Sequence, residues 1–339
     1  MRAWALDATG EDAAAALRDV PEPEVGPWDV RVTLRASGLN HLDRWVARGM
    51  PAPPAFPHVV GADGAGVVAE VGQAVEDVRV GSEVIVDPAV SCGRCRECLA
   101  GDVPYCAKFQ VVGEHRWGTH AEQVVVPAMN VVAKPDLLSW EEAGSFGLVT
   151  ASAVRMLRRG RLAAGEDVLV IGVGGGSATA AFLVASAAGA RLWATSTSDD
   201  AGTWATANGA EAVFDSHGPF DEAVREATGG RGVDLVVDNV GTATLERSLR
   251  SLARGGRLVT NGSTSGRTAE LHLPTVFWRQ LELIGSSMHD RTEFAEAVRL
   301  AGEGTVRIPV AEVTGFDDYT AALARLGSGG PVGKIVLAR

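Results

Sequence analysis

Four cysteines, the only ones in the chain, are the residues whose type and spacing most clearly predict chemistry. They follow the pattern C-x2-C-x2-C-x7-C, at Cys92, Cys95, Cys98 and Cys106. Four clustered thiolates bind one Zn²⁺ tetrahedrally at about 2.3 Å, and such a closed site is structural rather than catalytic. Two disulfides or four free thiols are the alternatives. The chain starts without an apolar signal run, so we expect a reducing cytoplasm and predict a structural zinc.

A glycine-rich loop is the second group with a chemical interpretation. The apolar run 168–171 leads directly into the sequence GVGGGSA, and a helix-forming stretch of small residues follows. In a strand–loop–helix unit, glycines let the backbone approach a pyrophosphate, whose charge the first amides of the helix receive. A glycine-rich turn without a ligand is the alternative. We predict a dinucleotide site with contacts from Gly172, Gly174, Gly175, Gly176, Ser177 and Ala178.

The end of the next strand-like segment indicates which dinucleotide is bound. An acidic residue there would bind the ribose 2′-hydroxyl of NAD and repel the 2′-phosphate of NADP. The chain has Ser196, Thr197 and Ser198 at this place, followed by Asp199 and Asp200, with no adjacent Lys or Arg. Because hydroxyl groups can donate to a phosphate, we expect NADP(H) to be preferred. NAD(H) is the alternative, and a plain polar turn is the third interpretation.

Two kinds of segment must position these groups. Residues 1–140 contain short β-type runs between Gly and Pro, such as DVRVTLRA and GSEVIVDP, which are typical of a β-barrel domain with a zinc lobe at about 90–110. Residues 141–290 alternate strands with helices, including one helix over WEEAGSFGLVTASAVRMLRR, which predicts a doubly wound parallel sheet. Residues 291–339 contain a helix and a final strand, and we expect them to pack onto the other domains. The predicted fold class is α/β.

Size and charge restrict the partners. The 339 residues are enough for two domains. A net charge of −11 disfavours binding to nucleic acid or to an anionic membrane surface. No apolar stretch reaches the roughly 20 residues that a membrane helix needs. We therefore expect a small-molecule substrate, with neither nucleic acid nor membrane as a partner. Lys108, Lys134 and Lys334 are the only lysines, so few are available for a phosphate.

The motifs together resemble the medium-chain dehydrogenase/reductase superfamily almost from end to end. The resemblance covers FPHVVGADGAGVVAEVG, the four-cysteine lobe, GVGGGSA, GGRLVTNG and the closing GKIVL. It implies a GroES-like catalytic domain and a Rossmann domain, with the active site in the cleft between them. It also implies hydride transfer between a nicotinamide and a carbonyl, an alcohol or an activated double bond, and assembly as a homodimer or homotetramer. Cofactor contacts are implied at His41, Asn239, Asn261 and Lys334.

Alcohol dehydrogenases of this superfamily carry a second, catalytic zinc, and the resemblance places its ligands at three points of this chain. Asn40 stands where the first Cys belongs, Ala62 and Asp63 stand where His-Glu belongs, and Phe146 and Gly147 stand where the later Cys belongs. A catalytic zinc needs about three protein ligands and an open position. We therefore expect no catalytic zinc.

The segment GLNHLDRWVARG instead resembles the quinone oxidoreductases, the zinc-free branch of the superfamily. The resemblance implies that Asn40 and Asp43 line the nicotinamide cleft and that Thr150 lies beside the nicotinamide amide. Ordinary structural roles are the alternatives. Asparagine is a good helix N-cap, so Asn40 would cap a helix that starts at His41, and Thr150 would be an interior helix residue.

Without a Lewis acid, substrates that are already activated by conjugation are favoured, because their charge spreads to a distant oxygen. We expect Asn40 to donate a hydrogen bond to that oxygen, while the cofactor supplies the hydride. The predicted function is NAD(P)H-dependent reduction of a conjugated carbonyl or a quinone. The alternatives are an alcohol dehydrogenase or carbonyl reductase with a side-chain acid, and a non-catalytic dinucleotide-binding protein. His58, His115 and His120 are candidate proton donors, although a structural role is the better explanation for each.

Overall fold

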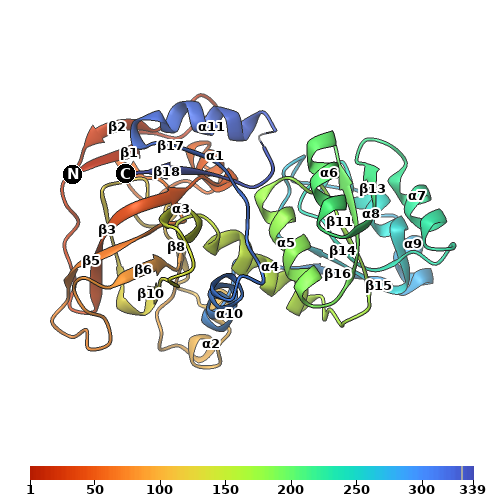
Figure 1. Ribbon diagram of the computed structural model, residues 1–339, viewed down its shortest axis with the longest axis horizontal. Coiled ribbons are helices and arrows are strands. Elements are labelled where there is room, and N and C mark those ends of the chain that lie inside the picture. Colours follow the sequence, from red (N-terminus) through yellow and green to blue (C-terminus); the bar gives the residue numbers. More distant parts are fainter. Residues whose placement is uncertain (330) are drawn as a thin grey trace. The chain divides into compact units, whose positions relative to one another are not determined.

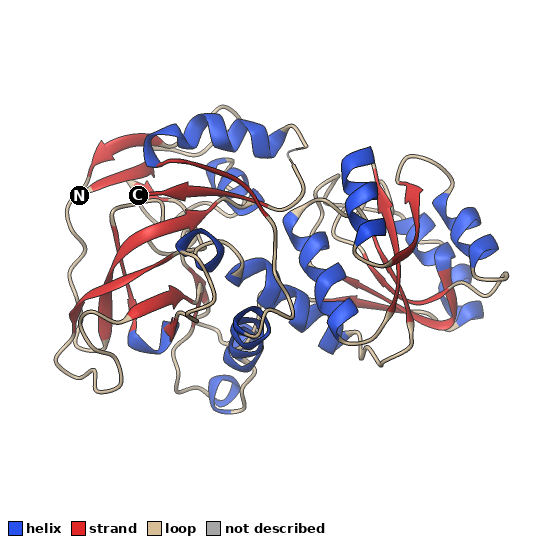
Figure 2. Ribbon diagram, viewed as in Figure 1, coloured by secondary structure: helices blue, strands red, loops and turns tan. Residues whose placement is uncertain are grey.

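The chain divides into two units that each contain a β-sheet of their own (Figures 1 and 2). The structure is a computed structural model that describes residues 1–329 and 331–339. The first unit contains residues 1–148, 289–330 and 334–339, and the second contains residues 149–288 and 331–333. Among the described residues, no helix is long and apolar enough to cross a membrane.

The first unit is built around β3, a ten-residue strand whose alternate residues are apolar and buried. Val30, Val32 and Leu34 point from β3 into a core that consists mainly of valines. β3 pairs antiparallel with β5, β9 and β18. The elements of this unit before residue 149 are β1 (Arg2–Leu6), β2 (Ala16–Asp19), β3 (Asp29–Gly38), α1 (His41–Ala47), β4 (His58–Val59), β5 (Ala65–Val71), β6 (Glu83–Val86), β7 (Ala89–Val90), α2 (Arg96–Leu99), β8 (Gln110–Val111), β9 (Gln123–Pro127), β10 (Val131–Ala133) and α3 (Trp140–Ala143).

The C-terminal segment returns to this unit and completes its main sheet. The strand order is β10-β6-β5-β3-β18-β17, with β9 also paired to β3. β18 therefore lies directly beside β3, although the two strands are far apart in sequence. This segment contains α10 (Arg291–Gly302), β17 (Val310–Gly315), α11 (Tyr319–Gly327) and β18 (Lys334–Ala338).

The second unit is the predicted doubly wound sheet, with six parallel strands and helices on both faces (Figure 2). The strand order is β13-β12-β11-β14-β15-β16, so the order reverses direction next to β11. Ligands of such sheets bind at this reversal, beyond the carboxyl ends of the strands. The elements are α4 (Gly147–Arg159), which starts in the first unit, β11 (Asp167–Val170), α5 (Gly176–Ala187), β12 (Arg191–Ser196), α6 (Asp199–Ala207), β13 (Ala210–Asp215), α7 (Phe220–Ala227), β14 (Val233–Val237), α8 (Leu245–Ser251), β15 (Leu252–Thr260), α9 (Leu273–Arg279) and β16 (Glu282–Gly285).

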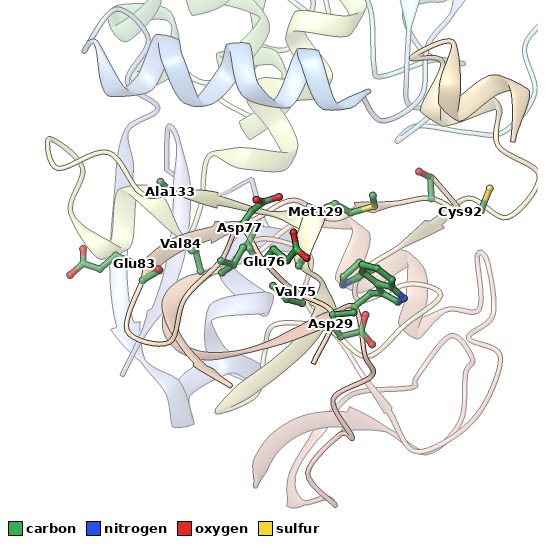
Figure 3. Close-up of a pocket in the computed structure, with 17 residues that line it drawn as sticks. Asp29, Val75, Glu76, Asp77, Glu83, Val84, Cys92, Met129 and Ala133 are labelled. Atoms are coloured by element: carbon green, nitrogen blue, oxygen red, sulfur yellow. The ribbon is translucent and has the colours of Figure 1, made fainter. Parts of the chain in front are cut away.

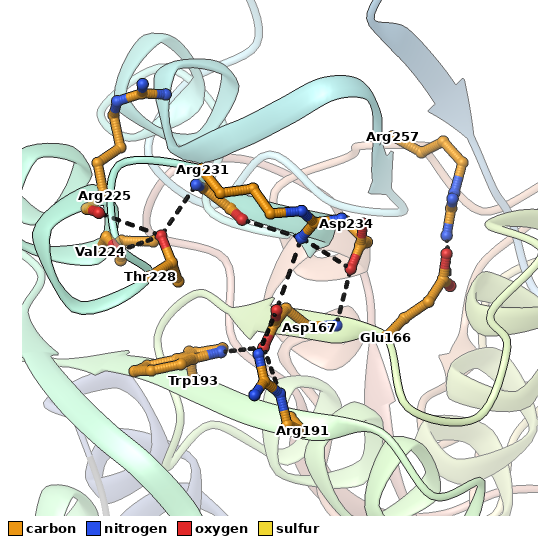
Figure 4. A network of polar contacts seen from close by, with 11 residues as sticks. Glu166, Asp167, Arg191, Trp193, Val224, Arg225, Thr228, Arg231, Asp234 and Arg257 are labelled. Atoms are coloured by element: carbon orange, nitrogen blue, oxygen red, sulfur yellow. Dashed lines mark hydrogen bonds and ion pairs between the residues drawn. The ribbon is translucent and has the colours of Figure 1, made fainter.

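A buried carboxylate fixes the opposite, amino-terminal edge of this sheet. Asp167 opens β11 and accepts hydrogen bonds from Arg191 Nε at 2.9 Å and from Trp193 Nε1 at 2.9 Å, both on β12. Its backbone N–H donates to Asp234 Oδ2 on β14 at 3.0 Å. Figure 4 shows these groups converging from the three strands. Because a buried charge is costly unless it is paired, these contacts hold β12 and β14 in register with β11.

Two local expectations were wrong. The helix expected over residues 140–159 is two helices, α3 and α4, separated at Gly144 and Ser145. The reason is a close approach to β3: a Cβ on Gly144 would lie 2.6 Å from the Ala36 carbonyl oxygen, and Gly38 N donates to Gly144 O at 2.7 Å. The sequence also did not predict β13, a short and only partly buried edge strand without a strong alternating pattern.

Candidate functional site

The four cysteine side chains converge in a lobe spanning residues 92–106. The sulfur of Cys98 lies 3.4 Å from that of Cys95 and 3.9 Å from that of Cys92, which in turn lies 3.6 Å from that of Cys106. All four sulfurs are within 4.8 Å of one another, and none forms a disulfide. Sulfurs placed tetrahedrally at about 2.3 Å from one ion stand roughly 3.8 Å apart. The cluster therefore fits a single zinc ion.

Backbone amides point at these sulfurs and favour the thiolate form that binds a metal. Cys98 N donates to Cys95 Sγ at 3.5 Å, and Lys108 N donates to Cys106 Sγ at 3.4 Å. The amides of Arg94 and Cys95 lower the pKa of Cys92 to about 6. Zinc ligation requires deprotonated cysteines, and the lowered pKa values of Cys92 and Cys98 suit it, whereas the pKa of Cys95 is raised in the metal-free cluster.

The glycine loop of the second unit has the geometry of a pyrophosphate cradle. Gly172 and Gly174 adopt positive φ values of 74° and 116°, and a Cβ on Gly174 would lie 2.8 Å from Ala201. Gly175 is the N-cap of α5, and no side chain caps that helix. The first turn of α5 contains the remaining predicted residues, Gly176, Ser177 and Ala178. The backbone amides of this turn are uncapped and lie at the positive end of the helix dipole. This arrangement fits a dinucleotide.

The hydroxyl groups of Ser196, the last residue of β12, and of Ser198 already form hydrogen bonds within a tight turn. Ser196 is buried, and its hydroxyl accepts from Ser198 N at 3.0 Å and donates to Ser198 O at 3.0 Å. The hydroxyl of Ser198 caps α6, and Thr197 is exposed. Asp199 and Asp200 are exposed in the first turn of α6, where negative charge is favourable for the helix dipole. The place of the NAD-binding carboxylate is thus occupied by a hydroxyl group.

Several buried polar atoms of the second unit have no hydrogen-bond partner among the described residues, and two of them belong to residues that the sequence predicts as site residues. These two atoms are Asn239 Nδ2 and Thr150 Oγ1. The other amide atom of Asn239, Oδ1, accepts from Asn261 N at 3.1 Å. Asn239 and Asn261 follow β14 and β15, at the same edge of the sheet as the glycine loop. Buried polar atoms are rarely left unpaired, so these two are suited to bind the amide and hydroxyl groups of a nicotinamide nucleotide.

In the first unit, Asn40, Asp63 and Lys334 form one buried hydrogen-bonded cluster. Lys334 Nζ donates to Asn40 Oδ1 at 2.5 Å and to Asp63 Oδ2 at 3.2 Å. Asn40 Nδ2 donates to the same Asp63 oxygen at 3.0 Å, while Leu148 N, in the first turn of α4, donates to Asp63 Oδ1 at 2.7 Å. The cluster joins segments whose residues are up to 294 positions apart.

Asp43 belongs to a second buried network behind this cluster. Its carboxylate accepts from the backbone N–H of Asn40 at 2.9 Å, which closes the N-terminal turn of α1. His120 Nε2 lies 3.3 Å from the same carboxylate oxygen, and His120 Nδ1 lies 3.1 Å from Ser37 Oγ. Burial, and secondarily Asp43, raise the pKa of the neighbouring Tyr319. Asp43 therefore positions Asn40 through the backbone, in addition to any contact that it makes with a cofactor.

The remaining histidines have identifiable surroundings. His41 is the first residue of α1, and desolvation, Arg44 and Lys334 lower its pKa, which keeps the imidazole neutral. His58 is buried, and its Nε2 lies 3.1 Å from Gly113 O; burial lowers its pKa. His115 Nδ1 accepts from Val111 N at 3.2 Å. These contacts give His58 and His115 structural roles.

From the sequence, Asp63 has no assigned role, His120 is a candidate proton donor, and Lys334 is expected to contact the cofactor. Besides that expected contact, Lys334 bonds to Asn40 and Asp63 within the first unit. Two features of the sequence could have indicated this cluster. One is the scarcity of lysines. The other is the acidic residue Asp63 beside Ala62, which stands where the alcohol dehydrogenases have a zinc ligand.

A separate cavity of about 880 Å³ opens on the barrel of the first unit, between Cys92 and Ala133 (Figure 3). Its lining combines carboxylates such as Asp29, Glu76 and Asp77 with apolar groups such as Met129. None of the clustered polar residues around Lys334 contributes to it. The cavity is therefore distinct from the cluster around Lys334, and it borders the cysteine lobe at Cys92.

Comparison with known proteins gives matches along most of the chain. Residues 26–136 match the alcohol dehydrogenase GroES-like domain, and residues 176–303 match the zinc-binding dehydrogenase domain. The chain is 31% identical to an NAD-dependent alcohol dehydrogenase of Sulfolobus acidocaldarius, with 99% of each chain covered. It is 30% identical to an acryloyl-coenzyme A reductase of Metallosphaera sedula, with 95% of each covered. A crystal structure of an NAD-dependent alcohol dehydrogenase superimposes with a TM-score of 0.95 and 40% identity, covering 100% of both chains.

The cysteine lobe gives a direct prediction. Purified protein should contain about one zinc ion per chain, and Cys98→Ser should lower this to near zero and reduce the thermal unfolding midpoint, because a structural zinc contributes folding energy. Arg94→Gln, at an exposed position of the same loop, is the matched control and should keep its zinc. Metal analysis and calorimetry measure both quantities. Two zinc ions per chain would show that a catalytic metal binds after all.

Proposed function

The chain belongs to the zinc-binding alcohol dehydrogenase family of the medium-chain dehydrogenase/reductase superfamily, and on that premise we propose that it reduces conjugated carbonyl compounds or quinones without a catalytic zinc. It is an NAD(P)-dependent oxidoreductase with a GroES-like domain and a Rossmann domain. The observation that carries the proposal is the buried cluster of Asn40, Asp63 and Lys334.

The donor set in this cluster is unsuited to a catalytic metal. Asn40 and Ala62 replace the Cys and His of the zinc enzymes, and neither side chain is a good zinc ligand. The carboxylate of Asp63 is already bonded to Lys334, Asn40 and a helix amide. Among the described residues, the four cysteines form the one group of three or more side chains placed to hold a metal.

A conjugated acceptor suits a site of this composition. When hydride adds to the β-carbon of an enone or enoyl thioester, the electron pair of the C=C bond moves through the conjugated system to the carbonyl oxygen. The α-carbon then takes a proton from water, which gives the saturated product. Bound NAD(P)H supplies the hydride, and the protein supplies orientation and electrostatic stabilisation. A hydrogen-bond donor at the oxygen is enough, because conjugation has already lowered the cost of placing charge there.

The relatives support two reaction classes. Acryloyl-coenzyme A is an α,β-unsaturated thioester, so the similarity to its reductase favours conjugated substrates. The similarity to alcohol dehydrogenases favours the second candidate, oxidation of an alcohol or reduction of an isolated carbonyl with a side-chain acid in place of zinc. The site composition favours the first class.

The first prediction concerns substrate class. With NADPH, kcat/KM for an enone, an enoyl thioester or a quinone should exceed that for a simple ketone by about 100-fold or more, because an isolated carbonyl lacks the metal that would offset its oxyanion charge. Oxidation of a simple secondary alcohol with NADP⁺ should be equally poor. Steady-state absorbance at the nicotinamide band measures all reactions. Turnover of the alcohol with no conversion of any conjugated acceptor would contradict the proposal.

The second prediction concerns the cofactor, for which we propose NADP(H). Ser196→Asp restores a carboxylate at the end of β12, which should bind the ribose diol and repel a 2′-phosphate. The ratio of kcat/KM for NADPH to that for NADH should fall by about tenfold or more. Ser186→Asp adds the same charge at an exposed position of α5 and should leave the ratio unchanged. A wild-type enzyme that prefers NADH would overturn this assignment.

The edge of the second unit's sheet supports assembly with a second copy. β16 is the last strand of the sheet, and Leu283 on it is 47% exposed. Phe277 and Trp278, at the end of the preceding helix α9, are 60% and 69% exposed. An apolar, unpaired strand edge is a liability unless another chain covers it. We therefore propose a two-fold dimer in which β16 pairs with its equivalent.

The third prediction tests this interface. Leu283→Lys should shift the protein from dimer to monomer, because it places a charge on the pairing edge. Val80→Lys, on the first unit at another exposed apolar residue, should leave the dimer intact. Light scattering after size-exclusion chromatography gives both masses. A wild-type protein that is monomeric, or a Leu283→Lys variant that stays dimeric, would contradict the interface.

A further inference from the structure

Lys334 is a buried cation held in a fixed position. Its side chain is 3% exposed, and it is the first residue of β18, a strand that is paired on both sides. The backbone N–H of Lys334 donates to Pro309 O at 2.9 Å, which fixes the start of the strand. The long side chain therefore extends from a fixed backbone position toward Asn40 and Asp63.

Lys334 and Asn40 differ in how many of their side-chain N–H groups already have an acceptor. Asn40 Nδ2 carries two hydrogens, and these meet Asp63 Oδ2 at 3.0 Å and Gly38 O at 3.4 Å. The ammonium of Lys334 carries three, of which two are directed to Asn40 Oδ1 and Asp63 Oδ2. Among the described residues, no acceptor pairs with the third. We expected Asn40 to donate to the substrate, but both of its N–H groups already have acceptors. Lys334 has one N–H group without an acceptor among the described residues.

Asp63 is the counter-ion of this ammonium. A buried charge is costly unless an opposite charge pairs with it. Asp63 supplies the negative charge at 3.2 Å, and it is itself held by Leu148 N at the start of α4. Asn40 and Asp63 are two of the residues that stand where the resemblance places ligands of a catalytic zinc, and the ammonium of Lys334 contacts both of them.

We propose that the Lys334 ammonium donates its third N–H to the substrate carbonyl oxygen and stabilises the negative charge that forms there during hydride transfer. The inference rests on the proposed function and names the group that replaces the metal. No covalent bond to lysine forms: hydride adds to the β-carbon, the C=C electron pair moves to the oxygen beside Lys334, and the α-carbon is protonated by water. Lys334 keeps its proton throughout, so its role is electrostatic.

The test compares the full-length wild-type protein with a variant that lacks both charges of the buried pair. Asp63→Asn combined with Lys334→Met removes the ammonium together with its counter-ion, so neither charge is left buried and unpaired. The double variant should have a kcat for an enone about 100- to 1,000-fold below that of the wild type, the usual loss for one oxyanion donor. NADPH affinity, followed by nicotinamide fluorescence, should agree within about threefold between the two. Lys134→Met, at a lysine paired with Glu83 on the barrel, is the control for the loss of a lysine and should keep wild-type kcat.

Each outcome decides the assignment. Equal kcat values for the wild type and the double variant would overturn it, and so would an unchanged kcat with weakened NADPH binding, since that pattern assigns Lys334 to the cofactor phosphates. If the double variant loses its zinc or its folded far-UV spectrum, Lys334→Gln with Asp63 intact replaces it, and an unchanged kcat there overturns the proposal as well. Failure of the wild-type enzyme on every conjugated acceptor would instead contradict the proposed function.

Discussion

The negative charge of Asp63 must be neutralised inside the first unit, and the candidate site is organised around that requirement. The carboxylate is 1% exposed and has three donors, which come from α1, α4 and β18. Each donor is supplied by a segment that arrives from a different part of the chain. A buried carboxylate that lost one of them would be left partly unpaired, so the site and the packing of the C-terminal strand depend on each other.

A second layer of hydrogen bonds gives the cluster its orientation. Asp43 closes the turn at Asn40 and receives His120, which in turn contacts Ser37 on β3. In a zinc enzyme, ligand side chains are oriented by partners of this kind in an outer shell. Here the same principle applies to an amide and an ammonium. Hydrogen bonds from the surrounding backbone and side chains fix the orientation of Asn40 and Asp63.

Local patterns in the sequence were sufficient for the zinc lobe, the glycine loop and the N-cap at Asn40, because each depends on residues within about fifteen positions. The break at Gly144 depends on contact with β3, about a hundred residues away, and no periodicity reports it. The pairing of Lys334 with Asn40 spans 294 positions and follows only from the register of β18 beside β3. The role of Asn40 depends on counting its hydrogen-bond partners, which requires three dimensions.

An ammonium and a zinc ion differ in what they can activate. Zinc carries two positive charges and bonds directly to the substrate oxygen, so it can polarise an isolated carbonyl. An ammonium that shares its charge with Asp63 and Asn40 offers one hydrogen bond and a partly compensated charge. Such a donor is adequate when conjugation has already spread the developing charge, and inadequate when the charge stays on one oxygen. The role that we propose for the cluster therefore favours acceptors that stabilise most of their own charge, and the zinc that we predict for this chain is the one in the cysteine lobe.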